Sequence, residues 1–187
     1  LSIAGSVFFL LLSIGIGIQT GASAMIAPEV GRGAMNDGTS QVKEWIDNVS
    51  GMAIGFSVIS VLLGAFAARP LVVLLGAEPH IEPLAMEYLW VTLAGSIGFT
   101  LSFGAAGALM ALGDTKSNRN ALAIGFFANF ALNPLFTFGL GLGVTGIALA
   151  TVTIKLATAF YLLRVLAKRL NIRIRPAFDW SRWQALL

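Results

Sequence analysis

Four long stretches of the chain contain no charged residue, and this feature restricts its fold more than any other. The stretches are 1–28, 49–68, 88–113 and 120–154. A helix that crosses a bilayer needs about 20 consecutive apolar residues, because hydrocarbon offers no partner for unpaired backbone groups. Charged residues make up only 11% of the chain, whereas a soluble domain carries roughly a quarter. The sequence therefore predicts an all-α integral membrane protein.

The longest uncharged stretch, 120–154, exceeds the length of one membrane-spanning helix. The sequence GLGLG at 139–143 predicts a turn that divides it into two helices. The chain is then predicted to form five transmembrane helices in one lobe over 1–170, followed by a cytoplasmic connector over 171–187. The predicted helices are 1–28, 49–77, 86–112, 120–138 and 144–166.

The first uncharged run lacks an initiating Met, flanking charge and the short profile of a cleavable signal peptide. We therefore expect the chain to begin inside a longer protein.

Basic residues gather in alternate loops of this pattern, which predicts its orientation. Cytoplasmic loops of membrane proteins carry an excess of Lys and Arg. Ten of the twelve basic residues lie on one side, and the loop at 78–84 has none. The ten are Arg32, Lys43, Lys116, Arg119, Arg164, Lys168, Arg169, Arg173, Arg175 and Arg182. We place these segments in the cytoplasm and predict a multi-pass protein of the plasma (inner) membrane. Arg69 lies near the opposite interface, where its side chain can snorkel.

Residue types that several other functions need are missing or isolated. The chain has no Cys, which excludes disulfides and thiolate metal sites. The single His80 cannot supply a catalytic triad, and no catalytic pair lies within the spans, so we expect no enzyme and no cofactor. The basic tail lacks the groove-reading pattern of a nucleic-acid-binding segment. Its Trp180 and Trp183 suit a membrane interface, so we expect lipid rather than nucleic acid beside it.

Two amides and a hydroxyl lie in the most apolar part of the chain. Asn129 and Asn133 are four residues apart, so they share one face of a helix, and Thr151 lies on the next antiparallel helix. Pro134 leaves the carbonyl of Phe130 without its usual helical donor. Uncharged oxygens suit a hard cation such as Na⁺ when a carboxylate joins them. Amides within membranes also serve as interhelical hydrogen-bond glue, and the residues alone leave both interpretations open.

Lys155 is the only basic residue predicted inside a span. A lysine at a helix centre costs roughly 2.5–3.5 kcal/mol on insertion scales. Arg164, at the cytoplasmic end of the same helix, lies nine residues on, about 13 Å along the axis. Escape of the ammonium to that interface is therefore difficult. We favour a position lining a cavity in the lobe over a snorkelling lysine.

A family resemblance rests on residues 110–151, MALGDTKSNRNALAIGFFANFALNPLFTFGLGLGVTGIALAT. The run of Gly113 to Lys116, the two Asn residues, the Gly-rich turn and Gly146 to Thr151 resemble the multidrug and toxic compound extrusion (MATE) transporters. The phrase MEYLWVTLAGS at 86–96 resembles the start of the family's fourth helix, with Tyr88 and Gly95 in their usual places. Ser96 departs from the pattern, because many members have proline there.

The resemblance implies a MATE-like polytopic helical bundle, with this chain supplying helices two to six of one six-helix lobe, the amino-terminal one. It implies a cation site, for Na⁺ or H⁺, that includes Asn129, Asn133 and Thr151, with Tyr88 and Lys155 lining the cavity. The acidic residue of that site belongs to the family's first helix, which the chain lacks. The remaining helices of the same transporter are therefore expected partners, together with membrane lipid and a small organic substrate.

The implied function is a secondary antiporter. It would export organic compounds, cationic or amphipathic, in exchange for Na⁺ or H⁺ by alternating access. Two alternatives stay open, and they come from different classes. A lipid-linked oligosaccharide flippase of the same superfamily is supported only by Lys155. A non-transporting membrane scaffold would use its polar spans merely to join helices.

The charge pattern makes a topological prediction. Because the chain has no native Cys, single cysteines placed at positions 117 and 80 report the two sides of the membrane. In intact cells, an impermeant maleimide should label position 80, and should label position 117 only after the membrane is opened. Labelling of position 80 from the cytoplasm alone would contradict the predicted orientation.

Overall fold

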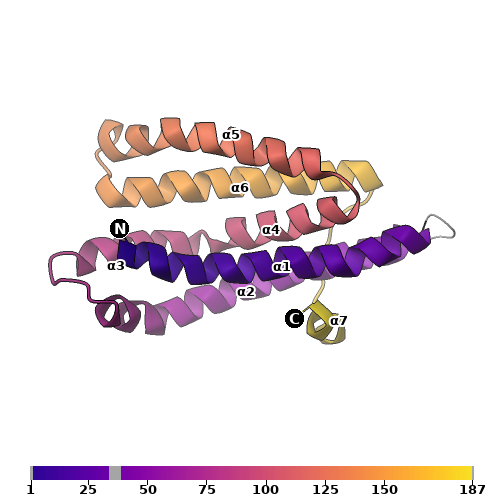
Figure 1. The fold of residues 1–187 in the computed structure, drawn as a ribbon, viewed down its shortest axis with the longest axis horizontal. Helices are drawn as coiled ribbons and strands as arrows, with labels where there is room; N and C mark the ends of the chain where they lie inside the picture. The colour runs from indigo at the N-terminus through magenta and orange to yellow at the C-terminus, as the bar shows by residue number, and fades with distance from the viewer. Residues whose placement is uncertain (1, 34–38, 187) are drawn as a thin grey trace.

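The computed structural model describes residues 2–33 and 39–186, and in this part of the chain every regular element is helical. The chain runs back and forth along an elongated bundle, with α4 continuing in the direction of α3 (Figure 1). The elements are α1 (Ser2–Gly33), α2 (Thr39–Leu74), α3 (Glu82–Ala94), α4 (Ser96–Ala111), α5 (Thr115–Pro134), the π-helix η1 (Leu135–Gly139), α6 (Gly143–Leu170) and α7 (Trp180–Leu186). The predicted all-α fold is confirmed.

By length and composition, three segments of the described chain can each cross a membrane: α2, α6, and α5 continued by η1. The bent pair α3–α4 is a fourth if its two helices form a single span. The side chains of most of the first eleven residues of α1 lie outside the described part of the chain, as do residues 1 and 187 at the ends of two predicted segments. The GLGLG turn lies where it was expected, between η1 and α6. Gly141 and Gly143 have φ of 67° and 54° there.

The predicted span over 86–112 is not one straight helix. The axis bends by 49° at Gly95, which separates α3 from α4. At the bend α6 approaches closely, because a side-chain carbon at Gly95 would overlap the side chain of Val152. Glycine therefore leaves room for α6 at this position.

The bundle is held together by close helix contacts and by hydroxyl groups. A side-chain carbon at Gly107 of α4 would overlap the carbonyl oxygen of Gln19, so α1 and α4 approach at backbone distance. Between α2 and α4, the hydroxyls of Ser57 and Ser96 lie 2.7 Å apart, and Thr100 Oγ1 donates to the carbonyl of Ala53 at 2.9 Å. These hydroxyls are buried and satisfied, as a membrane interior requires.

The turn between α4 and α5 explains the Gly-Asp-Thr-Lys segment. Gly113 has φ of 74°, and Asp114 caps α5 by accepting the Ser117 N–H at 3.0 Å. Asp114 also pairs with Arg169 of α6 at 2.7 Å. The hydrogen bonds from Ser117, with the guanidinium nearby, hold the pKa of the Asp114 carboxyl below its usual value. One carboxylate thus fixes the start of α5 and the end of α6.

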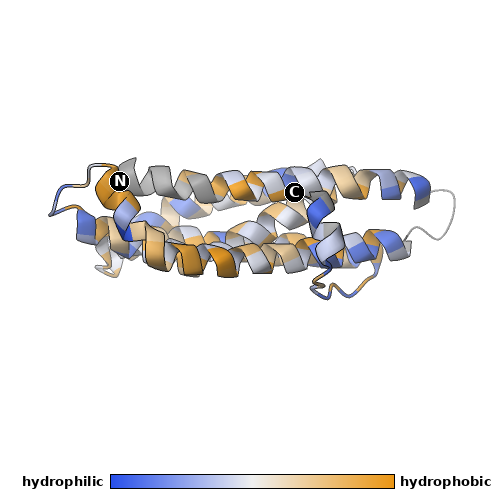
Figure 2. Ribbon diagram, turned by 90° about the horizontal axis from the view of Figure 1, so that it is seen from below, coloured by the Kyte–Doolittle hydropathy of each residue, from blue (hydrophilic) through white to orange (hydrophobic). Residues whose placement is uncertain are grey.

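Hydrophilic residues gather toward the two ends of the bundle, and hydrophobic ones occupy the length between them (Figure 2). At the end opposite the predicted cytoplasmic one, Arg69 Nε lies 2.7 Å from Glu82 Oε1, which joins α2 to α3. Large apolar side chains on α5 are exposed in the isolated chain, among them Phe126, Phe127 and Phe130. These rings suit contact with lipid or with further helices.

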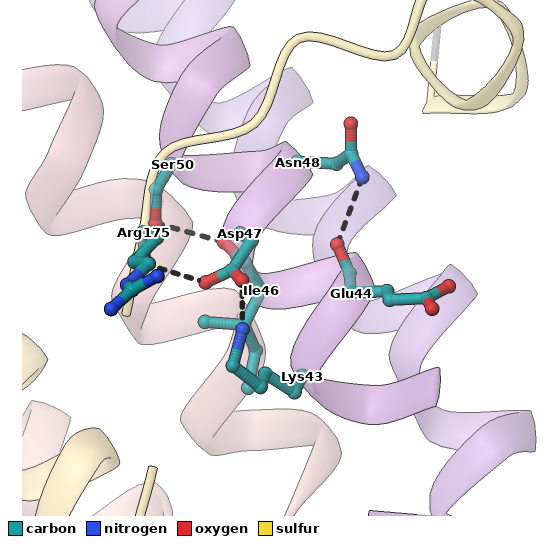
Figure 3. Close-up of polar contacts among 7 residues, drawn as sticks. All are labelled: Lys43, Glu44, Ile46, Asp47, Asn48, Ser50 and Arg175. Carbon is teal, nitrogen blue, oxygen red and sulfur yellow. Dashed lines mark hydrogen bonds and ion pairs between the residues drawn. The ribbon is translucent and has the colours of Figure 1, made fainter. Parts of the chain in front are cut away.

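The segment 172–179 crosses α2 as an extended strap, a feature that the sequence did not predict. The backbone N–H of Arg175 donates to Asp47 Oδ1 at 2.8 Å, as Figure 3 shows. The N–H of Ala177 donates to the Asp47 carbonyl at 2.9 Å, and that of Asp179 to Asn48 Oδ1 at 3.0 Å. Lys43 forms an ion pair with the second carboxylate oxygen of Asp47. The strap is therefore fastened to α2 at the alternate residues Arg175, Ala177 and Asp179.

Two glycines of α2 make room for this strap and for the helix that follows it. A side-chain carbon at Gly51 would overlap the carbonyl oxygen of Ala177, and one at Gly55 would lie 2.9 Å from the ring of Trp183. The predicted connector thus contains a docked strap and the short helix α7. That residues 171–187 connect two lobes remains a prediction.

Gly51→Ala tests this contact. The added methyl should displace the strap and destabilise the folded protein by about 1–3 kcal/mol, because the overlap is with backbone. Thermal unfolding in detergent measures the loss, and labelling of a cysteine at position 177 should become faster. Gly17→Ala is the matched control, because an added carbon there meets no described atom within 4 Å. Equal stability of the two variants would contradict the packing described.

Candidate ion-binding groove

A groove of about 210 Å³ lies between α5 and α6, near the middle of both helices. We refer to it as the α5–α6 groove. Its polar lining consists of Asn129, Thr151, Lys155 and Thr158, and its apolar lining of Ala121, Leu122, Gly125, Phe126 and Ile154. Small residues on α5 admit the neighbouring helix, since a side-chain carbon at Gly125 would lie 3.1 Å from Ile154. The structure therefore brings three of the predicted site residues to one cavity.

The two amides interact within α5. Asn133 Nδ2 donates to Asn129 Oδ1, as expected for residues one helical turn apart. The remaining oxygen, Asn133 Oδ1, is buried and has no hydrogen-bond partner among the described residues. The hydroxyl of Thr137, a further four residues on, is buried and unpartnered in the same way. Leaving such groups unsatisfied is costly, so both positions call for a ligand or for groups outside this chain.

This arrangement bears on the alternative that the amides join helices. The hydrogen bond between Asn133 and Asn129 ties two turns of one helix, and it fastens α5 to no other element. Hydroxyls of α2 and α4, by contrast, do form interhelical bonds, at Ser57, Ser96 and Thr100. Among the described helices the amides therefore do not act as glue, and a bond from Asn133 Oδ1 to a helix outside this chain stays open.

Thr151 is oriented as an acceptor. Its hydroxyl donates to the carbonyl of Ile147 at 3.0 Å, one turn earlier in α6. A hydroxyl has one proton and two lone pairs, so the lone pairs of Oγ1 remain for a cation or an N–H donor. Thr151 thus contributes a neutral oxygen to the groove, whereas Asn133 is not among the residues that line it.

Lys155 reaches across the groove to α4. Its Nζ lies 5.5 Å from the centre of the Phe99 ring and 5.3 Å from that of Phe103, two residues on one face of α4. Both distances are within the range of cation–π attraction, which is strongest where water is excluded. The lysine is half-buried and is one of the residues that line the groove. Its predicted place along the cavity of the whole lobe stays a prediction.

Tyr88 lies apart from these residues. It packs on α3 against a separate cluster that includes Ala68, Val72 and Leu89 of α2 and α3. These contacts place Tyr88 in a different part of the lobe from the α5–α6 groove. Its predicted place in the cavity of the whole transporter stays a prediction.

Two features of this region were not predicted from the sequence. The helix continues past Pro134 as the π-helix η1, in which Leu140 N–H donates to the carbonyl of Leu135. Such wider turns are frequent at functional sites. The second feature is Glu87, whose Oε2 accepts a hydrogen bond of 3.3 Å from Thr145 and so joins α3 to α6. The sequence did offer a signal for Glu87, because it is a carboxylate at the second position of the predicted span 86–112.

The charge balance of the groove limits what this chain can bind alone. The described residues contain no group of three or more His, Cys, Asp and Glu side chains that could hold a metal ion. Neutral oxygens from Asn133 and Thr151 suit a hard monovalent cation, but they bind weakly without a negative charge nearby. These oxygens would therefore hold a cation firmly only with a carboxylate from outside the described residues, and the predicted cation site stays a prediction.

Comparison with known proteins gives consistent results. The MatE family model matches residues 1–135. The chain is 29% identical over 188 residues to a protein of Shewanella oneidensis described as an FAD transporter, covering 96% of this chain and 40% of that protein. This chain thus spans about two fifths of the length of that curated relative.

Solved structures share the fold. One is described as the inward-facing conformation of a multidrug resistance MATE family transporter of the MOP superfamily; it superposes with a TM-score of 0.81 at 27% identity over 97% of this chain and 41% of that one. A second, described as the outward-facing conformation of such a transporter, gives 0.83 at 24% identity over 100% of this chain and 42% of that one. The arrangement of helices found here is therefore similar to that in both conformations.

Asn133→Ala should weaken Na⁺ binding, because it removes the unpartnered oxygen and frees Asn129. We expect a loss of about tenfold or more in affinity, which corresponds to roughly 1.4 kcal/mol. Isothermal titration with NaCl on the purified full-length protein measures it, and the double variant with Thr151→Ala should be non-additive because both would contact one ion. Ser117→Ala, which lies outside the groove, serves as the control. Unchanged affinity in Asn133→Ala would remove this residue from the site.

Proposed function

The chain belongs to the MatE family, the multidrug and toxic compound extrusion transporters, and from this membership we propose that the protein containing it is a secondary active antiporter. It exports an organic, amphipathic compound in exchange for Na⁺ or H⁺. Members of this family are transporters, so the chain is not part of an enzyme. It is an integral, multi-pass membrane protein, and we place it in the plasma (inner) membrane on the distribution of Lys and Arg.

The mechanism that we propose is alternating access, in which this lobe moves largely as one body. The similarity of its helices to both an inward-facing and an outward-facing structure supports this, because the lobe needs no refolding between the two states. Coupling requires that the ion bind one state more tightly than the other, since a ligand shifts an equilibrium only by its differential affinity.

The cation site that we propose uses Asn129, Asn133 and Thr151, and one observation supports it above the others. Asn133 Oδ1 is buried in an apolar helix pair without a hydrogen-bond partner in the described chain. Binding of the ion would draw Asn129 Oδ1 away from the amide of Asn133, so that both oxygens face the cation. A carboxylate from the remaining helices of the transporter would supply the negative charge.

Substrate identity has two candidate classes. Similar proteins are described as multidrug resistance transporters, and one as an FAD transporter. We propose a small organic substrate of the multidrug type as the first class and a flavin dinucleotide as the second. A flippase for lipid-linked oligosaccharide would need a more cationic cavity than the single Lys155 provides. A scaffold without transport is disfavoured, because the amides of α5 do not join helices.

Efflux measurements on inverted membrane vesicles containing the full-length protein test this function. A Na⁺ gradient or a pH gradient, imposed separately, should drive accumulation of an amphipathic dye against its concentration gradient. We expect Asn133→Ala to reduce the ion-driven component at least about tenfold while protein abundance is unchanged. A flux that follows the dye gradient alone, with neither ion gradient able to drive it, would rule out antiport.

A further inference from the structure

Lys155 is the feature of the α5–α6 groove that a cation site does not explain. It lies one helical turn after Thr151, and like charges at such spacing repel in a medium of low dielectric constant. An ammonium ion in this position should weaken the binding of Na⁺ or of an organic cation. The cation site therefore does not explain why the protein keeps a costly, half-buried positive charge at this position.

The described chain offers Lys155 no carboxylate. Its acidic side chains near the ends of the bundle take part in other contacts, and the ion pairs among the described residues do not include Lys155. Those pairs involve Glu29, Asp47, Glu78, Glu82 and Asp114. The neighbours of Nζ are the rings of Phe99 and Phe103, which attract the charge but do not neutralise it. Among the described residues, the positive charge is therefore not neutralised, and an anionic ligand would compete for it with the carboxylate that we expect from the remaining helices.

The side chains beside Lys155 present donors on one side and an apolar wall on the other. Asn129 accepts a hydrogen bond from Asn133 through one lone pair of its oxygen, and its NH₂ group remains free to donate to a ligand. The ammonium adds three further N–H donors. Leu122, Phe126 and Ile154 form the wall of the same groove. Donors that surround a positive charge beside an apolar surface are suited to an amphipathic anion.

We propose that the α5–α6 groove binds the carboxylate or phosphate group of a soluble, amphipathic organic anion, and that Lys155 is the residue that binds it. This inference rests on the proposed function and narrows its substrate from an amphipathic compound of either charge to an anion. The ring or chain of the substrate packs on Phe126 and Ile154, and Asn129 donates to the anionic group.

Use of Asn129 by both occupants explains how they exclude each other. The anion requires the amide oxygen to stay bonded to Asn133, so that NH₂ faces the groove. The cation requires the opposite, with the oxygen released and turned toward the ion. One amide cannot do both, and this exclusion is what exchange of one ligand for the other requires.

Three naphthalene derivatives of equal size test the charge preference directly. They are 2-naphthoate, 2-naphthamide and 2-naphthylmethylammonium, and their binding to the purified full-length protein in phosphatidylcholine nanodiscs is measured by fluorescence without any ion gradient. We expect the carboxylate to bind at least about tenfold more tightly than the other two, as charge-assisted hydrogen bonds are the stronger ones. Lys155→Gln should abolish this preference, and Lys155→Arg should retain it.

Lys116→Gln is the matched control, because it removes a positive charge from the exposed start of α5, outside the groove. It should leave the preference unchanged. Equal affinity for the three compounds, no binding of the carboxylate, or a preference that survives Lys155→Gln would overturn the inference. Displacement of naphthoate when phosphatidylglycerol is added to the nanodiscs would overturn it too, since the anion would then be a lipid. If the binding results hold and the vesicles show no ion-driven flux, the proposed function fails and the inference stands.

Discussion

Hydrocarbon supplies no hydrogen bonds, and the rest of this structure depends on that constraint. Each polar group in the spans needs a hydrogen-bond partner inside the protein or from a bound ligand. Ser57, Ser96 and Thr100 meet the requirement by joining α2 to α4. Where it is not met, at Asn133 Oδ1 and at the Thr137 hydroxyl, the unpartnered atoms lie on consecutive turns of one helix. The contrast distinguishes residues that hold the lobe together from residues that are open to binding.

The sequence predicted the helical class, the turn at 139–143 and the grouping of Asn129, Thr151 and Lys155, because each follows from a local pattern. Uncharged runs, glycine-rich turns and a four-residue spacing are each recognised within a short stretch of sequence. It did not predict the bend at Gly95, where the neighbouring residue is Val152, far along the chain on α6. The strap on α2 was missed for the same reason. Asp47 and Asn48 bind residues more than a hundred positions away, and periodicity carries no information at that distance.

The strap also changes how a basic tail should be interpreted. Charge alone indicates only which side of the membrane the tail occupies. Backbone N–H groups of Arg175, Ala177 and Asp179 nevertheless bind α2, and these contacts do not depend on the arginine side chain. A segment fastened in this way moves with the lobe to which it is attached. If the segment leads to a second lobe, it would transmit a displacement of α2 directly to that lobe.

The α5–α6 groove combines two opposite demands within one turn of helix. At Thr151 it presents a neutral oxygen atom, which favours a cation, and at Lys155 it presents a positive charge, which opposes one. Two fixed, separate sites would let both ligands bind together, since opposite charges attract. Exchange instead needs a shared group whose two states serve different ligands. The amide of Asn129 has that property, because it offers an acceptor when turned one way and donors when turned the other. In the exchange that we propose, its hydrogen bond to Asn133 would set which state prevails before any ligand arrives, and the coupling between ion and substrate would depend on the strength of one bond within α5.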